Sequence, residues 1–209
     1  MTTAEHKSDP PHLVFGPLER CVHLCVDMQR LFAEGTEWST PWMKRVLPNV
    51  LRLVRQDPAR TVFTRFIPPR SPEECEGAWR RYWTRWSSLT LQRLPREAVD
   101  LMPELAQFVP PAHVVDKRVH SPWLHPSLEQ HLRRLEADTL VVTGGETEVC
   151  VLGTVLGAID RGYRVVVAAD GLCSSSDKTH DELLDVCTSR YGQNVEVANA
   201  DEILRCWRS

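Results

Sequence analysis

The feature that most constrains this chain is a regular alternation of short apolar runs with longer amphipathic stretches. The apolar runs, such as CVHLCV at 21–26 and RVVVAA at 164–169, are continuous, which is typical of strands buried on both faces. Strands that alternate with helices predict a parallel sheet covered by helices on both sides. Because crossovers between parallel strands are right-handed, we expect one doubly wound, mostly parallel α/β sheet.

Six strands are expected, at 21–26, 61–66, 113–117, 139–143, 164–169 and 194–198. Helices are expected at 41–55, 127–135, 148–161 and 177–190, with mostly helical structure at 72–94 and a last helical turn at 201–207. Gly162 is a helix stop signal after the third of these helices. That helix is apolar on nearly all sides, so we expect it to pack centrally.

The length of 209 residues suits one substantial core better than two domains. We expect a single domain over 20–209, preceded by a polar, proline-containing tail at 1–19 that lies loosely on the surface. A formal charge of -3 gives no electrostatic reason to expect nucleic acid or a membrane as partner. The chain shows no secretory signal, no long apolar run and seven irregularly spaced cysteines, which favours reduced thiols in a cytoplasmic protein.

Side chains that can do chemistry follow three of the expected strands. Asp27 follows the first strand, Lys117 ends the third, and Cys150 lies near the start of the helix after the fourth. In open parallel sheets, ligands bind at the carboxyl ends of the strands. We therefore expect an acid, an amine and a thiol to meet at one edge of the sheet.

These three residues form a coherent catalytic set. The helix amino end and Lys117 are both expected to lower the pKa of the Cys150 thiol. Asp27 can accept the thiol proton and return it to a leaving amine. The pair Gly144-Gly145 allows a sharp turn that points peptide N–H groups at an oxyanion. Each residue also has an ordinary structural interpretation, so the residues alone leave both interpretations open.

Three stretches resemble the signatures of a known family: VDMQRLF at 26–32, DKRVHSPW at 116–123 and GGETEVCVLGTVLGAIDRGYRVVVAADG at 144–171. They are similar to those of the isochorismatase-like cysteine hydrolases, which include nicotinamidases, N-carbamoylsarcosine amidases, and ureidoacrylate and biuret hydrolases. The resemblance implies a Rossmann-like fold and an Asp-Lys-Cys triad at Asp27, Lys117 and Cys150. It also implies a cis peptide at Gly145-Glu146 and an oxyanion hole made by the backbone N–H groups of Glu146 and Cys150.

The resemblance further implies a homo-oligomer, a dimer or a tetramer, that acts on a small molecule. We expect no cofactor. Nicotinamidases of this family bind a metal through histidines after the second strand. The corresponding segment here, TRFIPPRSPEECEGAWRRYWTRW at 64–86, contains no histidine, so we expect no metal. The set Cys21, His23 and Cys25 is also excluded as a zinc site, because the two thiols on one strand lie about 13 Å apart.

A substrate pocket is expected among aromatic and basic residues near the motifs, namely Phe32, Trp38, Arg65, Trp83, Trp86 and Trp123. The tryptophans and arginines at 79–86 have helical spacing, which suits either an aromatic lid or a helix packed on a neighbour or a second subunit. We favour the packed helix over the aromatic lid. Arg65 has two possible partners, a substrate carboxylate or an acid such as Glu73.

The expected activity is metal-independent hydrolysis of a C–N bond in a small amide, carbamoyl or ureido compound, through a thioester on Cys150. True isochorismatases lack the cysteine, so its presence favours amide chemistry. Two alternatives stay open: an enol-ether hydrolase that uses Asp27 as acid, and a non-catalytic binding or scaffold relative. The exact substrate cannot be read from the sequence.

Overall fold

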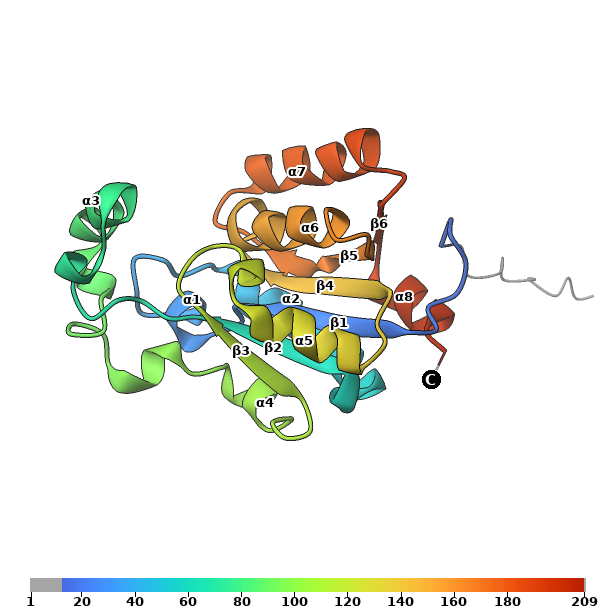
Figure 1. The fold of residues 1–209 in the computed structure, drawn as a ribbon, viewed down its shortest axis with the longest axis horizontal. Helices are drawn as coiled ribbons and strands as arrows, with labels where there is room; N and C mark the ends of the chain where they lie inside the picture. Colours follow the sequence, from blue (N-terminus) through green and yellow to red (C-terminus); the bar gives the residue numbers. More distant parts are fainter. Residues whose placement is uncertain (1–12, 209) are drawn as a thin grey trace, which may run out of the picture.

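Six parallel strands form one sheet at the centre of the protein, whose computed structural model describes residues 13–208 (Figure 1). They are β1 (Cys21–Val26), β2 (Thr61–Phe66), β3 (His113–Lys117), β4 (Thr139–Gly145), β5 (Arg164–Cys173) and β6 (Val195–Ala198). The strand order is β3-β2-β1-β4-β5-β6, and every neighbouring pair is parallel. The predicted doubly wound α/β fold is therefore confirmed, with its switch in strand order between β1 and β4.

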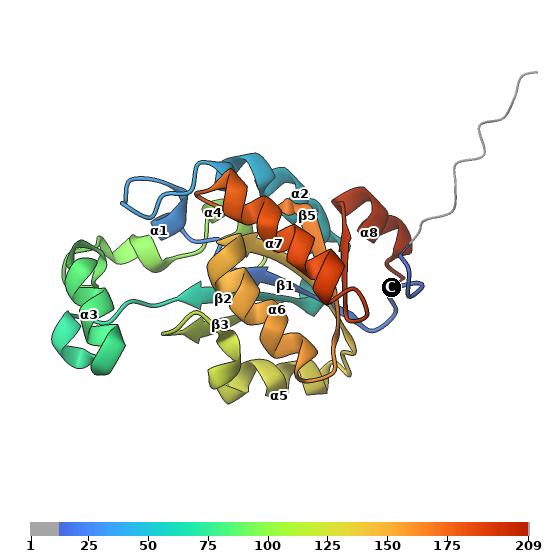
Figure 2. The ribbon, with the colours of Figure 1, turned by 90° about the horizontal axis from the view of Figure 1, so that it is seen from above.

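Helices cover both faces of this sheet (Figures 1 and 2). One face carries α5 (Pro126–Arg134), α6 (Leu152–Ile159) and α7 (Asp177–Arg190), and the other carries α2 (Trp42–Gln56), α4 (Pro103–Ala106) and α8 (Ala200–Cys206). The remaining α-helices are α1 (Arg30–Ala33), directly after β1, and α3 (Gly77–Arg85), which lies beyond the carboxyl ends of the strands.

Short helical turns complete the connections. Five are 3₁₀ turns, η1 (Pro58–Arg60), η2 (Pro72–Glu74), η3 (Ser87–Leu89), η4 (Arg96–Val99) and η5 (Pro122–Leu124), and η6 (Thr147–Val151) is a π-helical turn. None of the helices between residues 13 and 208 has the length and apolar character needed to cross a membrane.

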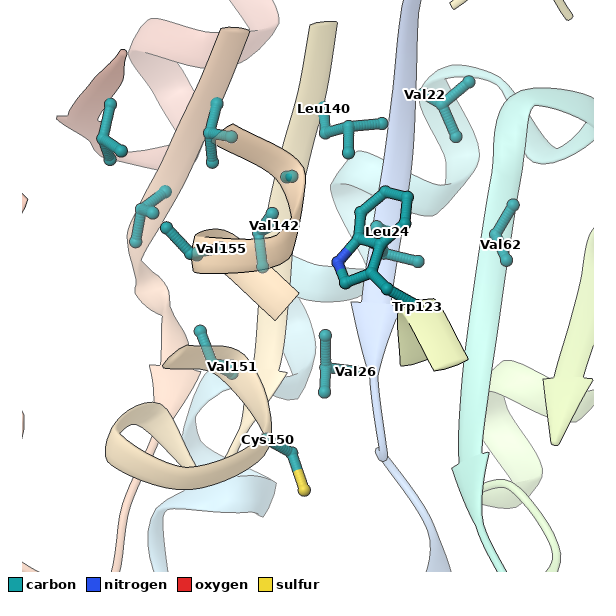
Figure 3. Packing of buried hydrophobic residues seen from close by; sticks show 14 of the residues in the cluster. Val22, Leu24, Val26, Val62, Trp123, Leu140, Val142, Cys150, Val151 and Val155 are labelled. Atoms are coloured by element: carbon teal, nitrogen blue, oxygen red, sulfur yellow. The ribbon is translucent and has the colours of Figure 1, made fainter. Parts of the chain in front are cut away.

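The central strands β1 and β4 are mostly apolar because every one of their residues is buried. In β1, Val22, Leu24 and Val26 point into the layer under α5, α6 and α7, which Figure 3 shows from close by. The alternate residue His23 faces the other way and is fully buried, with Nε2 2.8 Å from Thr143 Oγ1. Burial lowers the pKa of His23 to about 3, so this imidazole is a neutral core group.

Three expected elements differ clearly from those in the structure, β4 extends two residues further than expected, and others shift by one residue. The helix expected at 148–161 starts as the π-helical turn η6 and continues as the shorter α6, which buries Val155 and Ala158 but leaves Leu156 half-buried. Strand β5 runs past residue 169, because a register shift lets its end pair with Gly145. In the segment 72–94, which was expected to be mostly helical, only α3 is α-helical. The 3₁₀ turns η2 and η3 lie on either side of it.

The N-terminal segment is better anchored than expected. The first twelve residues of the predicted loose tail at 1–19 lie outside the described residues. Leu13 and Leu18 are buried against the cluster that contains Ile203 and Trp207 of the C-terminal segment, whereas Val14 and Phe15 between them are exposed. The Leu18 N–H also donates to the carbonyl of Cys206 at 2.9 Å.

Candidate active site

The predicted acid, amine and thiol meet at the carboxyl edge of the sheet. Asp27 directly follows β1, Lys117 is the last residue of β3, and Cys150 lies in the π-helical turn η6 after β4. Figure 3 shows Cys150 at the arrowhead end of the strands, with its sulfur pointing beyond the aliphatic layer that Val26 and Val151 form. The three residues are only 0%, 4% and 6% exposed, respectively.

Lys117 joins the other two side chains. Its Nζ lies 2.7 Å from Asp27 Oδ2 and 3.3 Å from Cys150 Sγ, and it also donates to the Val119 carbonyl at 3.2 Å. The other carboxylate oxygen of Asp27, Oδ1, accepts a hydrogen bond of 2.6 Å from the Thr64 hydroxyl. Oδ2 is thus the carboxylate oxygen that faces Lys117, while Oδ1 is held by Thr64.

The resting protonation state of the thiol differs from the sequence-based expectation. Burial, and then the negative charge of Asp27, raise the pKa of Cys150 well above its ordinary value, although Lys117 opposes this. Burial alone would lower the pKa of Lys117, but the charges of Asp27 and Cys150 outweigh it and raise that pKa. Cys150 therefore rests as a thiol beside an ion pair, because Asp27 offsets the charge that was expected to lower its pKa.

The backbone before the thiol has an unusual conformation. The Gly145–Glu146 peptide is cis, at the position that the family resemblance implied. Gly144 has a φ of 103°, and a Cβ there would lie 2.0 Å from the Val26 carbonyl oxygen, so only glycine allows this approach of β4 to β1. The Glu146 carbonyl accepts hydrogen bonds from the N–H groups of Val149 and Val151. These bonds close the turn that contains Glu146 and Cys150.

A cavity of about 370 Å³ opens beside Cys150. Its lining residues are Phe32, Glu37, Trp38, Ser39, Phe66, Tyr82, Trp86, His120, Glu146, Val149, Cys150 and Ser175. Phe32, Trp38 and Trp86 were predicted pocket residues and do line it. Trp38 is central, since its ring centroid lies within 5.6 to 6.0 Å of those of five other rings.

Three predicted pocket residues lie elsewhere. Arg65 forms a bidentate ion pair with Asp116, in which Nε and Nη2 donate to Oδ1 and Oδ2 at 2.7 and 2.9 Å. The two residues lie opposite each other on β2 and β3. Trp83 is 1% exposed and stacks behind Phe66, so it supports the lining without reaching the cavity. Trp123 packs on the α6 face, where its Nε1 donates to the Thr154 carbonyl at 2.8 Å (Figure 3).

Helix α3 combines the two interpretations of the tryptophan and arginine segment. Trp83 is buried in the core, whereas Tyr82 and the following Trp86 form part of the cavity wall. Trp79 packs against His120 with ring centroids 5.1 Å apart. The arginines of the segment, Arg80, Arg81 and Arg85, are exposed. The segment therefore both packs on the core and walls the candidate site.

Sequence reasoning missed several residues of the site. His120 is the most notable, because its Nδ1 lies 3.9 Å from Cys150 Sγ and its ring stacks on Phe66. Burial and the charge of Lys117 lower the pKa of His120, so the imidazole is neutral at neutral pH. Its place three residues after Lys117, within the DKRVHSPW motif, was the signal that could have identified it. Glu37 and Tyr82 carried no comparable signal.

The prediction that the site needs neither metal nor cofactor stays a prediction. Within residues 13–208, no three His, Cys, Asp or Glu side chains gather closely enough to hold a metal ion. The ammonium of Lys117 and the imidazole of His120 lie beside the thiol, and the carboxylate of Asp27 is paired with Lys117.

A buried thiol, ammonium and carboxylate at the switch point of a doubly wound sheet define a candidate cysteine-hydrolase site. Residues 21–199 match the family model of the isochorismatase domain, and the chain therefore belongs to the isochorismatase family of hydrolases. Among curated proteins, it is 42% identical over 53 residues to the isochorismatase domain-containing protein 2 of Rattus norvegicus, which is 25% of either chain. The chain spans half or less of the length of the curated relatives it matches.

Solved structures share the fold. The cysteine hydrolase from Pseudomonas syringae pv. phaseolicola superposes with a TM-score of 0.75 and 22% identity, over 89% of this chain and 91% of that one. The N-carbamoylsarcosine amidase from Thermoplasma acidophilum does so with a TM-score of 0.70 and 20% identity, over 87% of this chain and 96% of that one. These likenesses show that the architecture is that of isochorismatase-like hydrolases.

Proposed function

We propose that this protein is a metal-independent cysteine hydrolase that cleaves the C–N bond of a small amide, carbamoyl or ureido compound through a Cys150 thioester. The observation that carries the proposal is the position of Lys117 Nζ, 2.7 Å from Asp27 Oδ2 and 3.3 Å from Cys150 Sγ, beside a cavity of about 370 Å³. A thiol with a base and a fixed cation is what nucleophilic acyl transfer requires. Two solved structures with this fold are a cysteine hydrolase and an amidase, which supports the same chemistry.

Acylation begins with the protonated thiol. Because burial raises the pKa of Cys150, the proton moves to Asp27 Oδ2 as the sulfur attacks the substrate carbonyl carbon. The fixed charge of Lys117 stabilises the negative charge that develops on the sulfur. The backbone N–H groups of Glu146 and Cys150 are the proposed donors to the carbonyl oxygen, which becomes an oxyanion in the tetrahedral intermediate.

Collapse of the intermediate breaks the C–N bond. The leaving ammonia or amine takes the proton from Asp27, and the acyl group stays on Cys150 as a thioester. Water then enters, loses a proton to Asp27 and attacks the thioester carbon. The second collapse releases the acid and returns the proton to the sulfur. In this scheme Asp27 acts as base and acid in turn, while Lys117 stays protonated.

The proposed thioester separates this route from the two alternatives. Enol-ether hydrolysis with Asp27 as acid forms no covalent adduct, and a scaffold protein turns over no substrate. A cytoplasmic location and a homo-oligomeric state accompany the proposal as further predictions.

The experiment is an ammonia-release screen of small amides, carbamoyl and ureido compounds with the wild-type protein, Cys150→Ala and the control Cys75→Ser. Cys75 is a half-buried thiol away from the cavity. We expect Cys150→Ala to lower kcat/KM by about 10³-fold or more with unchanged thermal unfolding, whereas Cys75→Ser retains activity. Dialysis against EDTA is expected to have no effect. Wild-type turnover by Cys150→Ala would contradict the proposal, as would reversible inactivation by the chelator.

A further inference from the structure

We propose that the substrate accepted at Cys150 is a cationic amide, whose ammonium group is held among the aromatic rings and the two carboxylates of the cavity. This inference rests on the proposed function, because it describes the part of the substrate that lies away from the C–N bond to be cleaved.

The charged side chains that line the cavity are acidic. They are Glu37 and Glu146, and no lysine or arginine lines the cavity within the described part of the chain. Glu37 Oε1 accepts a hydrogen bond of 2.5 Å from the Ser88 hydroxyl, and Glu146 Oε1 accepts one of 3.2 Å from the Ser175 N–H. The bond to Ser175, itself a lining residue, holds the Glu146 carboxylate at the cavity, whereas Glu37 is exposed and its partner Ser88 lies outside the lining. The negative charge of both residues favours a cation.

The nearby positive groups do not offset this charge. Lys117 is already paired with Asp27 at 2.7 Å, so the catalytic ion pair adds no net positive charge. Burial and Lys117 lower the pKa of His120, so its imidazole is neutral at neutral pH. Arg65 is held by Asp116 at 2.7 Å and, at 3.7 Å, by Asp100, away from the cavity. Arg85 packs on the Trp86 ring but is exposed and is not one of the lining residues, so a substrate carboxylate would find no cation in the cavity wall.

Aromatic rings form most of the remaining wall. Phe32 and Trp38 are stacked, with centroids 5.9 Å apart, and Trp86 meets Trp38 at 66° with centroids 5.7 Å apart. The wall thus contains two tryptophans, the ring type over whose face a cation binds best, within about 6 Å of the centroid. Trp86 already accepts one cation in this way, because Arg85 lies 5.1 Å from its centroid.

The dimensions suit a short molecule. The scissile carbonyl must lie at Cys150, and the cavity of about 370 Å³ falls at the small end of ligand sites. An ammonium group a short chain away from the amide would reach the rings while the carbonyl stays at the thiol. Quaternary ammonium groups suit such a wall particularly well, because they are weakly hydrated and bind to ring faces without needing a hydrogen bond.

The test measures binding separately from chemistry. Cys150→Ala protein is titrated calorimetrically with betaine amide, its neutral isostere 3,3-dimethylbutanamide and the anionic succinamate. We expect betaine amide to bind about tenfold more tightly than the neutral isostere, and succinamate to bind most weakly. Adding Glu37→Gln or Glu146→Gln is expected to lower the ratio of cationic to neutral affinity severalfold. The control Glu104→Gln, an exposed residue of α4 outside the cavity, should leave that ratio unchanged.

The possible outcomes separate this inference from the proposed function. Equal or tighter binding of the neutral or anionic amide overturns the cationic assignment, and so does the absence of betaine amide binding at millimolar concentration. Ammonia release by the wild-type protein from neutral amides alone would overturn the cationic assignment but support the hydrolase. Tight betaine amide binding without ammonia release from any amide would support the cation site but contradict the proposed function.

Discussion

Lys117 Nζ lies 2.7 Å from Asp27 Oδ2, and the two side chains are only 2% and 0% exposed. Strand β2 separates the strands that carry them, so Lys117 reaches over Phe66, whose ring centroid lies 5.0 Å from Nζ. Removing one partner of such a buried ion pair lowers the free energy of unfolding strongly, because the other partner remains as a buried charge without a counter-charge. The pair therefore couples the stability of the fold to the chemistry proposed at Cys150.

Removing Lys117 alone is expected to destabilise the protein. Lys117→Met leaves the carboxylate of Asp27 buried without its cation, which should lower the free energy of unfolding by about 3 kcal/mol. The double variant Asp27→Asn with Lys117→Met removes both charges and should recover much of this loss. Urea unfolding of the three proteins measures both effects. A loss below about 1 kcal/mol for the single variant would show that the pair is not a compensated buried charge pair.

The raised pKa of Cys150 predicts slow alkylation in the free protein. A thiol whose pKa is raised is protonated at neutral pH, and its thiolate appears only as the pH rises above the ordinary range of cysteine. We expect iodoacetamide to modify the half-buried Cys75 faster than Cys150 at pH 7, and the Cys150 rate to increase steadily toward pH 10. Peptide mapping by mass spectrometry follows both sites. Faster labelling of Cys150 at pH 7, with a plateau below pH 8, would instead indicate a resting thiolate.

Trp86 and Trp123 form a matched pair, since both were expected in the pocket but only Trp86 lines the cavity. Trp86→Leu removes a ring from the wall and should lower kcat/KM about tenfold with little loss of stability. Trp123→Leu leaves a hole in the core and removes the hydrogen bond to the Thr154 carbonyl. It should cost about 3 kcal/mol of stability while the folded fraction keeps its kcat/KM. Steady-state kinetics and thermal unfolding of both variants check this. The reverse pattern would place Trp123 at the substrate.

Two glycines of α6 should respond in opposite ways to a methyl group. A Cβ on Gly157 would lie 2.1 Å from Trp123 Cδ1, so Gly157→Ala should overpack the core and cost about 2 kcal/mol. A Cβ on Gly153 would have its nearest neighbour, the Ser121 backbone nitrogen, at 3.5 Å, so Gly153→Ala should stabilise the helix by about 0.5 kcal/mol. Denaturant unfolding distinguishes the two, and equal effects would contradict the packing of Trp123 on α6.

Most of the fold could be predicted because its local signals agree with its long-range packing. The expected bounds of β1, β2 and β3 are those that the structure shows, and the signal is strongest in β1, where every residue is buried. The residues at strand ends then placed Asp27, Lys117 and Cys150 at one edge, because parallel strands share a carboxyl edge. What could not be predicted was the continuation of β5 past residue 169, because it depends on a register shift against β4.

The pocket was harder to predict because its members are chosen by tertiary contacts. Arg65 was a plausible anion ligand until the register between β2 and β3 placed Asp116 beside it. Trp123 follows a motif of the site, yet the η5 turn directs its ring to α6 rather than to the cavity. His120 and Glu37 lie on loops whose path the sequence pattern does not specify. Even the thiol pKa was misjudged, because burial and the charge of Asp27 outweigh Lys117.

The thioester on Cys150 is the central claim, and rapid acid quenching of the protein during turnover of an amide substrate tests it most directly. Intact-protein and peptide mass spectrometry should find the acyl group of the substrate on the peptide that contains Cys150, and no such adduct in Cys150→Ala. A protein that releases ammonia at full rate with no acyl adduct on Cys150 at any quench time, or with the adduct on another residue, would contradict the mechanism.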